Sequence, residues 1–361
     1  MRISISMRVL SALVGTALLA ACSGSGESQS AGYASSGVPP ISAAHVLGMR
    51  SRFPANTALN GLGAVHPDHH KSWVSPDVKK ARRLLFVSDD STNDVYIFTM
   101  PAMALKGTLT GFTEPQGMCT DRNGYVWITN TETSQVFQYS RTGRLLKSVS
   151  VPGYLPVGCA VNKSNGDLAV SNLISASGYA GNVEIFTGGS GSGSPITNPS
   201  QTQYYFPAYD TSGNLYVDGF STSGYFILSE CSAGGSSCGT LNVLGGTVSF
   251  PGGLNWDRVN KELVAGDQSC NDEAASCQYA MTISGSAATI TGSTPLNEYN
   301  GSGCDVDQGT LALNSKYFAG PCISQASASS VSARWPYPAG GNPTKYNTAT
   351  TFPVGSAISS K

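Results

Sequence analysis

Short runs of alternating apolar and polar residues recur along this chain from about residue 84 to its C-terminus. Such alternation predicts β-strands that are buried on one face. In most units a turn containing Asp or Asn, usually with Gly, precedes a strong strand, because these residues accept the backbone conformations of tight turns. The strong strands centre on Val87, Ile128, Val170, Val217, Ala265 and Phe318.

A third strand follows the strong strand of a unit, and a weaker fourth strand ends the unit. Third strands are expected at 135–140, 182–186, 224–229 and 278–283, and fourth strands at 145–150 and 240–244. Four antiparallel strands in a unit of about 40–50 residues are typical of a β-propeller blade. We therefore predict an all-β chain with a six-bladed β-propeller over residues 82–361.

A Pro-x-Gly phrase marks the innermost strand of several units. It occurs at 114–121, 155–162 and 352–359, and more loosely at 250–257. The last copy has no strands after it, and the first unit has no copy before it. Residues 352–359 are therefore predicted to form the inner strand of blade one, which would close the ring and remove its open edge. The alternative is that Ser72–Ser75 forms this strand and the C-terminal tail lies outside.

The Pro-x-Gly phrase, the Asp-x-x-Gly turn and the aromatic residue that follows resemble the NHL-type repeat of six-bladed β-propellers. The wider group includes gluconolactonase/regucalcin-like propellers and virginiamycin B lyases. The resemblance extends over about 82–361 and implies the fold, whereas propellers host many activities. The lyases are associated with a His on the propeller. The four His of this chain, at 45, 66, 69 and 70, all precede it, so lyase activity is not expected.

The N-terminus has the pattern of an export signal. Positive charges precede an uncharged apolar run over 9–21, which suits a signal peptide and is too short to span a bilayer. The sequence Leu19-Ala20-Ala21-Cys22 looks like a bacterial lipobox, which predicts cleavage before Cys22 and acylation of this residue. The alternative is an ordinary signal peptide with an incidental Cys.

The segments before the propeller follow from this pattern. We expect a lipoprotein signal peptide at 1–21, a Ser/Gly-rich flexible tether at 22–45 and a lead-in segment at 46–81. The lipid would anchor the exported protein to the cell envelope, at the outer membrane where the cell has one. The protein would then face the periplasm or the exterior.

The low charge narrows the choice of partners. Charged residues make up 12% of the chain and the net charge is −1, so no basic patch is present to attract nucleic acid. We expect a monomer that meets the membrane through its lipid and binds an unidentified envelope protein or small ligand.

Nine Cys are present, and eight remain after the acylated one. Disulfides persist in oxidising compartments, so four pairs are expected. Cys231–Cys238 and Cys270–Cys277 would each close a short loop, and Cys304–Cys322 would join neighbouring strands. Cys119–Cys159 remains by elimination. None has the CxxC spacing of a zinc or redox site.

Two groups of residues could hold a metal ion. The segment His66-Pro67-Asp68-His69-His70 could gather a transition metal, and the alternative, which we favour, is a polar lead-in loop. The other group lies where strong strands end, and these ends converge around the central channel of a propeller. Oxygen ligands of this kind suit Ca²⁺ or another divalent ion. The members of this channel-face group are Asp89, Glu114, Asn130, Asn172, Asp218 and Asp267.

The resemblance to gluconolactonases gives the channel-face group a possible role. Those enzymes hold a divalent ion on Glu, Asn and Asp side chains and use it to activate water or polarise a lactone. In the competing interpretation, these side chains cap the loop to the third strand. A second polar group, Asp121, Asn162, Asp210, Asp257 and Asp307, is expected in structural turns at the other end of the strands. The aromatic residues Phe86, Trp127, Tyr216 and Trp256 are expected to pack between blades.

Two functions remain open at this point. The first is a lipid-anchored binding or scaffolding module that needs no cofactor. The second is a divalent-metal-dependent hydrolase or lactonase of the gluconolactonase type, with its site on the central channel.

Overall fold

The computed structural model describes residues 71–270, 275–324 and 330–361. The signal peptide 1–21, Cys22, the tether 22–45, the His66–His70 segment and most of the lead-in lie outside the described residues. Within the described residues, no helix is long and apolar enough to cross a membrane. Their regular secondary structure is almost entirely strands, in agreement with the all-β prediction.

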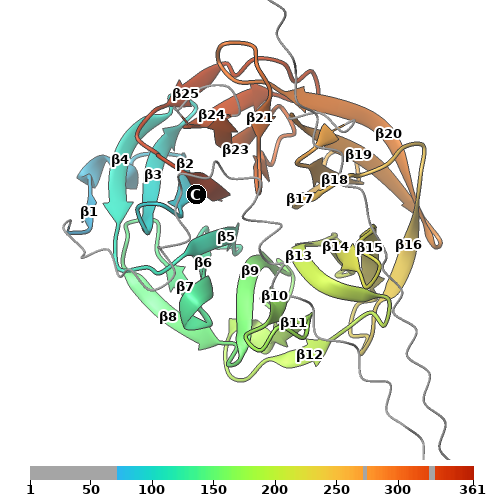
Figure 1. Cartoon of the computed structure of the whole chain (residues 1–361). Helices are drawn as coiled ribbons and strands as arrows, with labels where there is room; N and C mark the ends of the chain where they lie inside the picture. Colours follow the sequence, from blue (N-terminus) through green and yellow to red (C-terminus); the bar gives the residue numbers. More distant parts are fainter. Residues whose placement is uncertain (1–70, 271–274, 325–329) are drawn as a thin grey trace, which may run out of the picture. The chain divides into compact units, whose positions relative to one another are not determined.

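The strands form five sheets that follow one another in chain order around a common centre (Figure 1). The first sheet has the order β1 (Trp73–Val74), β4 (Ala104–Leu109), β3 (Asp94–Met100), β2 (Arg83–Asp89), β26 (Pro353–Ser360). The second runs β5 (Pro115–Thr120), β6 (Val126–Asn130), β7 (Gln135–Tyr139), β8 (Leu145–Ser150). The third runs β9 (Tyr154–Val161), β10 (Leu168–Ser175), β11 (Ala180–Phe186), β12 (Ser194–Ile196).

The next sheet has eight strands in two halves. One half is β13 (Gln201–Tyr209), β14 (Leu215–Ser221), β15 (Phe226–Cys231), β16 (Gly239–Leu244), and the other is β17 (Pro251–Asp257), β18 (Glu262–Asp267), β19 (Ser276–Ser284), β20 (Ala287–Leu296). The outer strands β16 and β20 pair in parallel, from Asn242↔Ala287 to Leu244↔Thr289. The last sheet contains β21 (Cys304–Asp305), β22 (Thr310–Leu311), β23 (Tyr317–Ser324), β24 (Val331–Pro336), β25 (Lys345–Asn347). Short 3-10 helices are η2 (Pro76–Lys79), η3 (Thr131–Thr133) and η4 (Thr187–Gly189).

The C-terminal strand belongs to the first sheet. β26 pairs antiparallel with β2, from Arg83↔Ser360 to Asp89↔Pro353. This is the pairing predicted for residues 352–359. β1, which contains part of the alternative Ser72–Ser75 segment, pairs instead with β4 at the opposite edge of the same sheet.

The Gly of the Pro-x-Gly phrase lets neighbouring inner strands approach closely. A Cβ atom on Gly355 would overlap the backbone of Gln116, one on Gly117 would overlap Val157, and one on Gly158 would overlap Tyr205. The Pro lies in register with a residue at or near the end of the second strand, and the register shifts between the Pro and the Gly or the residue after it. The phrase therefore encodes an inner strand with a bulge and without side-chain bulk at its closest contact.

Buried side chains form clusters between consecutive groups of strands. In the described residues there are six such clusters. Representative pairs across them are Phe86 with Ile128, Trp127 with Val170, Val183 with Val217, Tyr216 with Leu263, Val264 with Phe318, and Ala319 with Leu85. Phe86, Trp127 and Tyr216 are buried in these clusters, and Trp256 stacks on Tyr216 with ring centroids 6.0 Å apart. Each sheet thus buries both faces against its neighbours.

All four predicted disulfides are present. Cys119–Cys159 joins the inner strands β5 and β9 of two sheets, and Cys304–Cys322 joins β21 to β23. Cys231–Cys238 and Cys270–Cys277 each join Cys residues that are seven positions apart. The first bridge lies at the end of β15 and the second at the start of β19.

Gln308 joins several inner strands near the centre. Its Oε1 accepts a hydrogen bond from the Met118 backbone N–H at 2.7 Å, and its Nε2 donates to the Met118 carbonyl at 3.0 Å. Its own backbone N–H donates to the carbonyl of Val354 on β26 at 3.0 Å. Its side-chain stem lies against Gly253 on β17. Strands β5, β26 and β17 therefore meet at one buried residue.

Candidate functional site

The second strands end on the face of the molecule where the inner strands begin. We call this end the entry face, because the chain enters each inner strand there. All six residues of the channel-face group lie in this region: five end or lie near the end of a second strand, and Glu114 immediately precedes β5. Their hydrogen bonds to the backbone determine which of their polar atoms can still bind a ligand.

Asp89 and Asp267 bind the chain that enters the inner strand of their own sheet. Asp89 Oδ2 accepts from the N–H groups of Thr351 and Phe352, at 2.5 and 3.0 Å. Asp267 accepts from Ser249 N–H at 2.9 Å and Phe250 N–H at 3.0 Å. These N–H groups belong to the two residues directly before the Pro of the phrase. They lie next to the bulge that interrupts the hydrogen bonds between the inner and second strands. Each carboxylate also caps the loop to the third strand, as one interpretation predicted.

Asn130 has the same role in its sheet, and Asp218 binds the corresponding residue before a Pro, which lies inside β13 at a register shift. Asn130 Oδ1 accepts from Thr113 N–H at 2.7 Å, and Asp218 Oδ1 accepts from Phe206 N–H at 2.8 Å. We call Asp89, Asn130, Asp218 and Asp267 the entry latches. In the last sheet the Cys304–Cys322 disulfide makes the corresponding link between the start of the inner strand and the second strand.

Two of the channel-face residues are not entry latches. Asn172 donates from Nδ2 to Asn182 Oδ1 on the neighbouring strand at 2.7 Å, and it is fully buried. Glu114 has a positive φ of 53°, and its backbone N–H donates to Asn93 Oδ1 at 2.8 Å. Its carbonyl accepts from Thr131 N–H at 3.1 Å, so its backbone is fixed on both sides.

Asp218 is the latch with spare chemical capacity. Its side chain is fully buried, and Oδ2 makes no hydrogen bond within the described residues. Burial raises the pKa of Asp218 well above its usual value, although the hydrogen bond from Phe206 N–H opposes the shift. The described residues contain no group of three or more His, Cys, Asp or Glu side chains arranged to hold a metal ion. The structure thus brings the channel-face residues to one face, where Asp89, Asn130, Asp218 and Asp267 accept hydrogen bonds from the backbone.

The entry face also carries two matched hairpins that our sequence analysis missed. Ser175–Tyr179 follows β10 and Ser221–Tyr225 follows β14, and both have the sequence Ser-x-Ser-Gly-Tyr. In both, the Ser hydroxyl accepts from the Tyr N–H, at 2.9 and 3.2 Å, and the Gly has a positive φ. Tyr179 is 54% exposed and Tyr225 is 75% exposed. The repeated five-residue sequence is the signal from which both hairpins could have been predicted.

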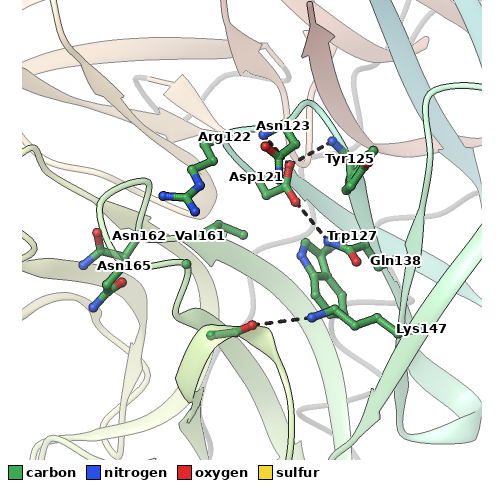
Figure 2. Close-up of a pocket in the computed structure, with 12 residues that line it drawn as sticks. Asp121, Arg122, Asn123, Tyr125, Trp127, Gln138, Lys147, Val161, Asn162 and Asn165 are labelled. Carbon is green, nitrogen blue, oxygen red and sulfur yellow. Dashed lines mark hydrogen bonds between the residues drawn. The ribbon is translucent and has the colours of Figure 1, made fainter.

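A cleft lies on the opposite face, between the β5–β8 and β9–β12 sheets. It has a volume of about 290 Å³. Figure 2 shows Asp121 and Arg122 of the β5–β6 turn on one side, Asn162 and Asn165 of the β9–β10 turn on the other, and Lys147 of β8 below them. The walls come from turns of two sheets that are about 40 residues apart in the chain.

Most of the second polar group takes the predicted turn role. Asp121, Asn162, Asp210 and Asp257 each accept a hydrogen bond from the backbone N–H two residues later. The prediction for Asp307 was wrong. It lies in the gap between β21 and β22, and burial with nearby Asp305 and Asp90 raises its pKa well above the usual value. Asn314 supplies the corresponding turn side chain of this sheet, with Oδ1 3.4 Å from Lys316 N–H.

Comparisons with known proteins agree with the fold. The family model of the SMP-30/gluconolactonase/LRE-like region matches residues 60–172, which is less than half of the chain. No curated protein matches the chain. The chain is therefore similar to this family over its first described sheets.

Solved structures resemble the chain over most of its length. A protein of unknown function from Bacteroides caccae is 12% identical with a TM-score of 0.58, covering 78% of this chain and 100% of its own. A chain of a nidogen/laminin complex is also 12% identical with a TM-score of 0.58, covering 77% and 98%. TolB from Acinetobacter baumannii is 11% identical with a TM-score of 0.56, covering 80% and 68%. At such identities the likeness shows the fold alone, an all-β propeller.

Proposed function

We propose that this chain is a six-bladed β-propeller, anchored to the cell envelope by lipid on Cys22, and that it acts as a binding module. Six blades are supported by the six clusters between consecutive groups of strands, the last of which joins the β21–β25 sheet to the β2 sheet. Closure by the C-terminal strand is supported by the β2–β26 ladder. Deleting residues 350–361 should then expose the edge of β2 and give insoluble protein. A soluble truncated chain with an unchanged melting temperature would refute closure.

The observation that carries the binding function is the pair of exposed tyrosines on matched hairpins. Tyrosine offers a large, rigid contact area with a polar end, and it is enriched in binding interfaces. The same hydrogen bonds fix both hairpins, so Tyr179 and Tyr225 are presented on the entry face of neighbouring groups of strands. An envelope protein is the partner that such a rigid aromatic pair suits best.

Site-specific photo-crosslinking in a bacterial host tests this function. A photoreactive amino acid would replace Tyr179 or Tyr225 in the full chain, and Tyr346 would be the matched control. Tyr346 is 46% exposed on the outer strand β25, and its ring stacks on Tyr299. We expect both hairpin positions to give the same discrete crosslinked protein and position 346 to give none. Equal crosslinking at all three positions, or none, would contradict the proposal.

A metal-dependent lactonase is the second candidate function. It is favoured by the family match over 60–172 and by the buried Asp218 oxygen that has no hydrogen-bond partner in the described residues. The full chain would be assayed for bound metal and for lactone hydrolysis, with melting curves in Ca²⁺ and in EDTA. Stoichiometric metal that is lost in Asp218→Asn, together with lactone turnover, would replace the binding function by this one. An unchanged melting temperature in EDTA and no turnover would eliminate it.

Lipid anchoring places the propeller at a membrane surface, the outer membrane where the cell has one. Metabolic labelling with a fatty-acid analogue should modify the wild-type chain and leave a Cys22→Ser chain unlabelled and released from the membrane fraction. Equal labelling of both chains would refute acylation at Cys22.

A further inference from the structure

The cleft on the face opposite the entry face has an excess of positive charge. Arg122 and Lys147 line it, and Asp121 is the one carboxylate among its lining residues. The carboxylate of Asp167 lies beside the cleft, where it accepts hydrogen bonds from Asn165 Nδ2 and Gly188 N–H, and it offsets part of the positive charge. The ammonium of Lys163 lies directly behind this carboxylate's turn and contacts the carbonyl oxygens of Thr120 and Asp121. This local charge contrasts with a chain whose net charge is −1.

Asp121 is part of the cleft wall and has little capacity left for a ligand. Its Oδ1 accepts from the N–H groups of Asn123 and Tyr125, at 2.8 and 2.9 Å. Its Oδ2 accepts from Gln138 Nε2 at 3.0 Å. The carboxylate is therefore held in its turn, as the dashed lines in Figure 2 show.

The two cations of the cleft retain donors for a ligand. Lys147 Nζ lies 5.2 Å from the centre of the Trp127 ring and 3.4 Å from the carbonyl oxygen of Gly188, which fixes the ammonium at the cleft. An ammonium has three donors, so at least one remains. Arg122 makes no hydrogen bond or ion pair with any described residue, and its guanidinium lies on the cleft side in Figure 2. Guanidinium groups bind carboxylate and phosphate oxygens in pairs.

The walls of the cleft are tied together by three links between the two sheets. The Cys119–Cys159 disulfide joins their inner strands. Lys163 of the β9–β10 turn donates to Thr120 and Asp121 at the end of β5, and Lys147 of β8 donates to Gly188 of η4. Such links reduce the ordering cost of binding, because the charged groups are already in place.

The size and the uncharged lining restrict the ligand further. A volume of about 290 Å³ is at the lower end for ligand pockets and suits one sugar ring or a molecule of similar size. Trp127 is buried under Lys147, so its face is not available for stacking. Asn123 and Tyr125 line the cleft and can hydrogen-bond to hydroxyl groups.

The geometry points to a binding site for a small hydroxylated oxyanion, such as a single sugar acid, whose negative group lies between Arg122 and Lys147. This site is separate from the entry face and from the hairpins that carry the proposed function. A charge-assisted hydrogen bond from each cation would hold the anion, and the amide and hydroxyl groups of the turns would contact the sugar hydroxyls.

Isothermal titration calorimetry on the full chain in detergent micelles tests the site. D-galacturonate is the probe, and D-galactose is the matched sugar without the carboxylate. Arg122→Gln and Lys147→Gln should each weaken galacturonate binding roughly tenfold or more. Arg144→Gln is the control, because Arg144 is an exposed cation on the β7–β8 turn that does not line the cleft. Melting curves would establish that all variants fold.

The outcomes distinguish binding of an oxyanion alone from binding of the whole sugar acid. We expect galacturonate to bind, galactose not to bind, and binding to weaken as salt rises from about 0.05 to about 0.5 M. Competition by inorganic phosphate would assign the affinity to the oxyanion alone, and a lack of competition would assign it to the sugar acid as a unit. Equal binding of galactose, no loss in either cleft variant, or no binding of any probe would overturn the site. None of these results depends on crosslinking at the entry face.

Discussion

Replacing Gln308 by Ala should destabilise the propeller more than its single side chain suggests. The change removes two hydrogen bonds, at 2.7 and 3.0 Å, and leaves the N–H and the carbonyl of buried Met118 without their partner. A buried polar group that loses its partner costs about 1–3 kcal/mol. Two such groups, and the space left beside Gly253, give an expected loss of about 3 kcal/mol in the free energy of unfolding.

A loss of this size is large enough to measure by two independent methods. At roughly 2–4 °C per kcal/mol for a domain of this size, the melting temperature should fall by roughly 6–12 °C. Guanidinium unfolding of the oxidised protein should give a lower midpoint with an unchanged slope. Gln135→Ala is the matched control, because Gln135 is a half-buried residue of β7 whose side chain makes no hydrogen bond within the described residues. It should stay within about 0.5 kcal/mol of wild type.

A Gln308→Ala chain within about 1 kcal/mol of wild type would refute the reasoning, because it would show that water replaces the side chain at no cost. Gln308→Glu adds a sharper test. It keeps the shape and loses the donor to the Met118 carbonyl, so it should be destabilised at neutral pH and partly restored as acid protonates the new carboxyl group.

Two further predictions concern the disulfides and Asp218. Removing the Cys119–Cys159 bridge by a double Ala substitution should lower the free energy of unfolding by about 4 kcal/mol, against about 2.5 kcal/mol for Cys231–Cys238. The reason is that the closed loops span 40 and 7 residues. Equal losses in guanidinium unfolding would argue against loop entropy as the cause. For Asp218, the raised pKa in the folded state means that its stabilising contribution is complete below the unfolded pKa of 3.8 and is lost as pH rises through the folded pKa. Asp218→Asn keeps the acceptor for Phe206 N–H, so its stability relative to wild type should increase with pH, and a difference that is constant across pH would show that Asp218 does not titrate.

The sequence predicts a structural feature well where a single physical requirement determines the residue type at a position. The Gly of the Pro-x-Gly phrase is required by contacts such as that between Gly117 and Val157, so the phrase locates inner strands reliably. Short Cys spacings likewise predict short loops. Side chains that cap a turn two residues later, such as Asp121, depend only on local geometry.

The features that were missed depend on the pairing of distant segments. The parallel β16–β20 pairing has no local signal, because it joins the outer edges of two groups of strands that are distant in the chain. The second role of Asp89, binding the N–H groups of Thr351 and Phe352, could be recognised only after β26 was in register with β2. Asp307 was misplaced because the inner strand of the last sheet is interrupted there. The cleft combines turns of two sheets, so no single stretch of sequence shows it.

The entry latches explain how this face can carry recognition without loss of stability. In three sheets the second strand ends at its latch, at Asp89, Asn130 and Asp267. β10 and β14 continue three residues past Asn172 and Asp218 and only then form the Ser-x-Ser-Gly-Tyr hairpins. The latch Asp218 fixes the backbone below one hairpin, and the hydrogen bond between Asn172 and Asn182 ties β10 to β11 below the other. The hairpin sequences can therefore vary with the proposed partner. Shortening either hairpin should therefore abolish crosslinking at its tyrosine and leave the melting temperature nearly unchanged. A substitution at a latch should instead lower the melting temperature and leave crosslinking unchanged.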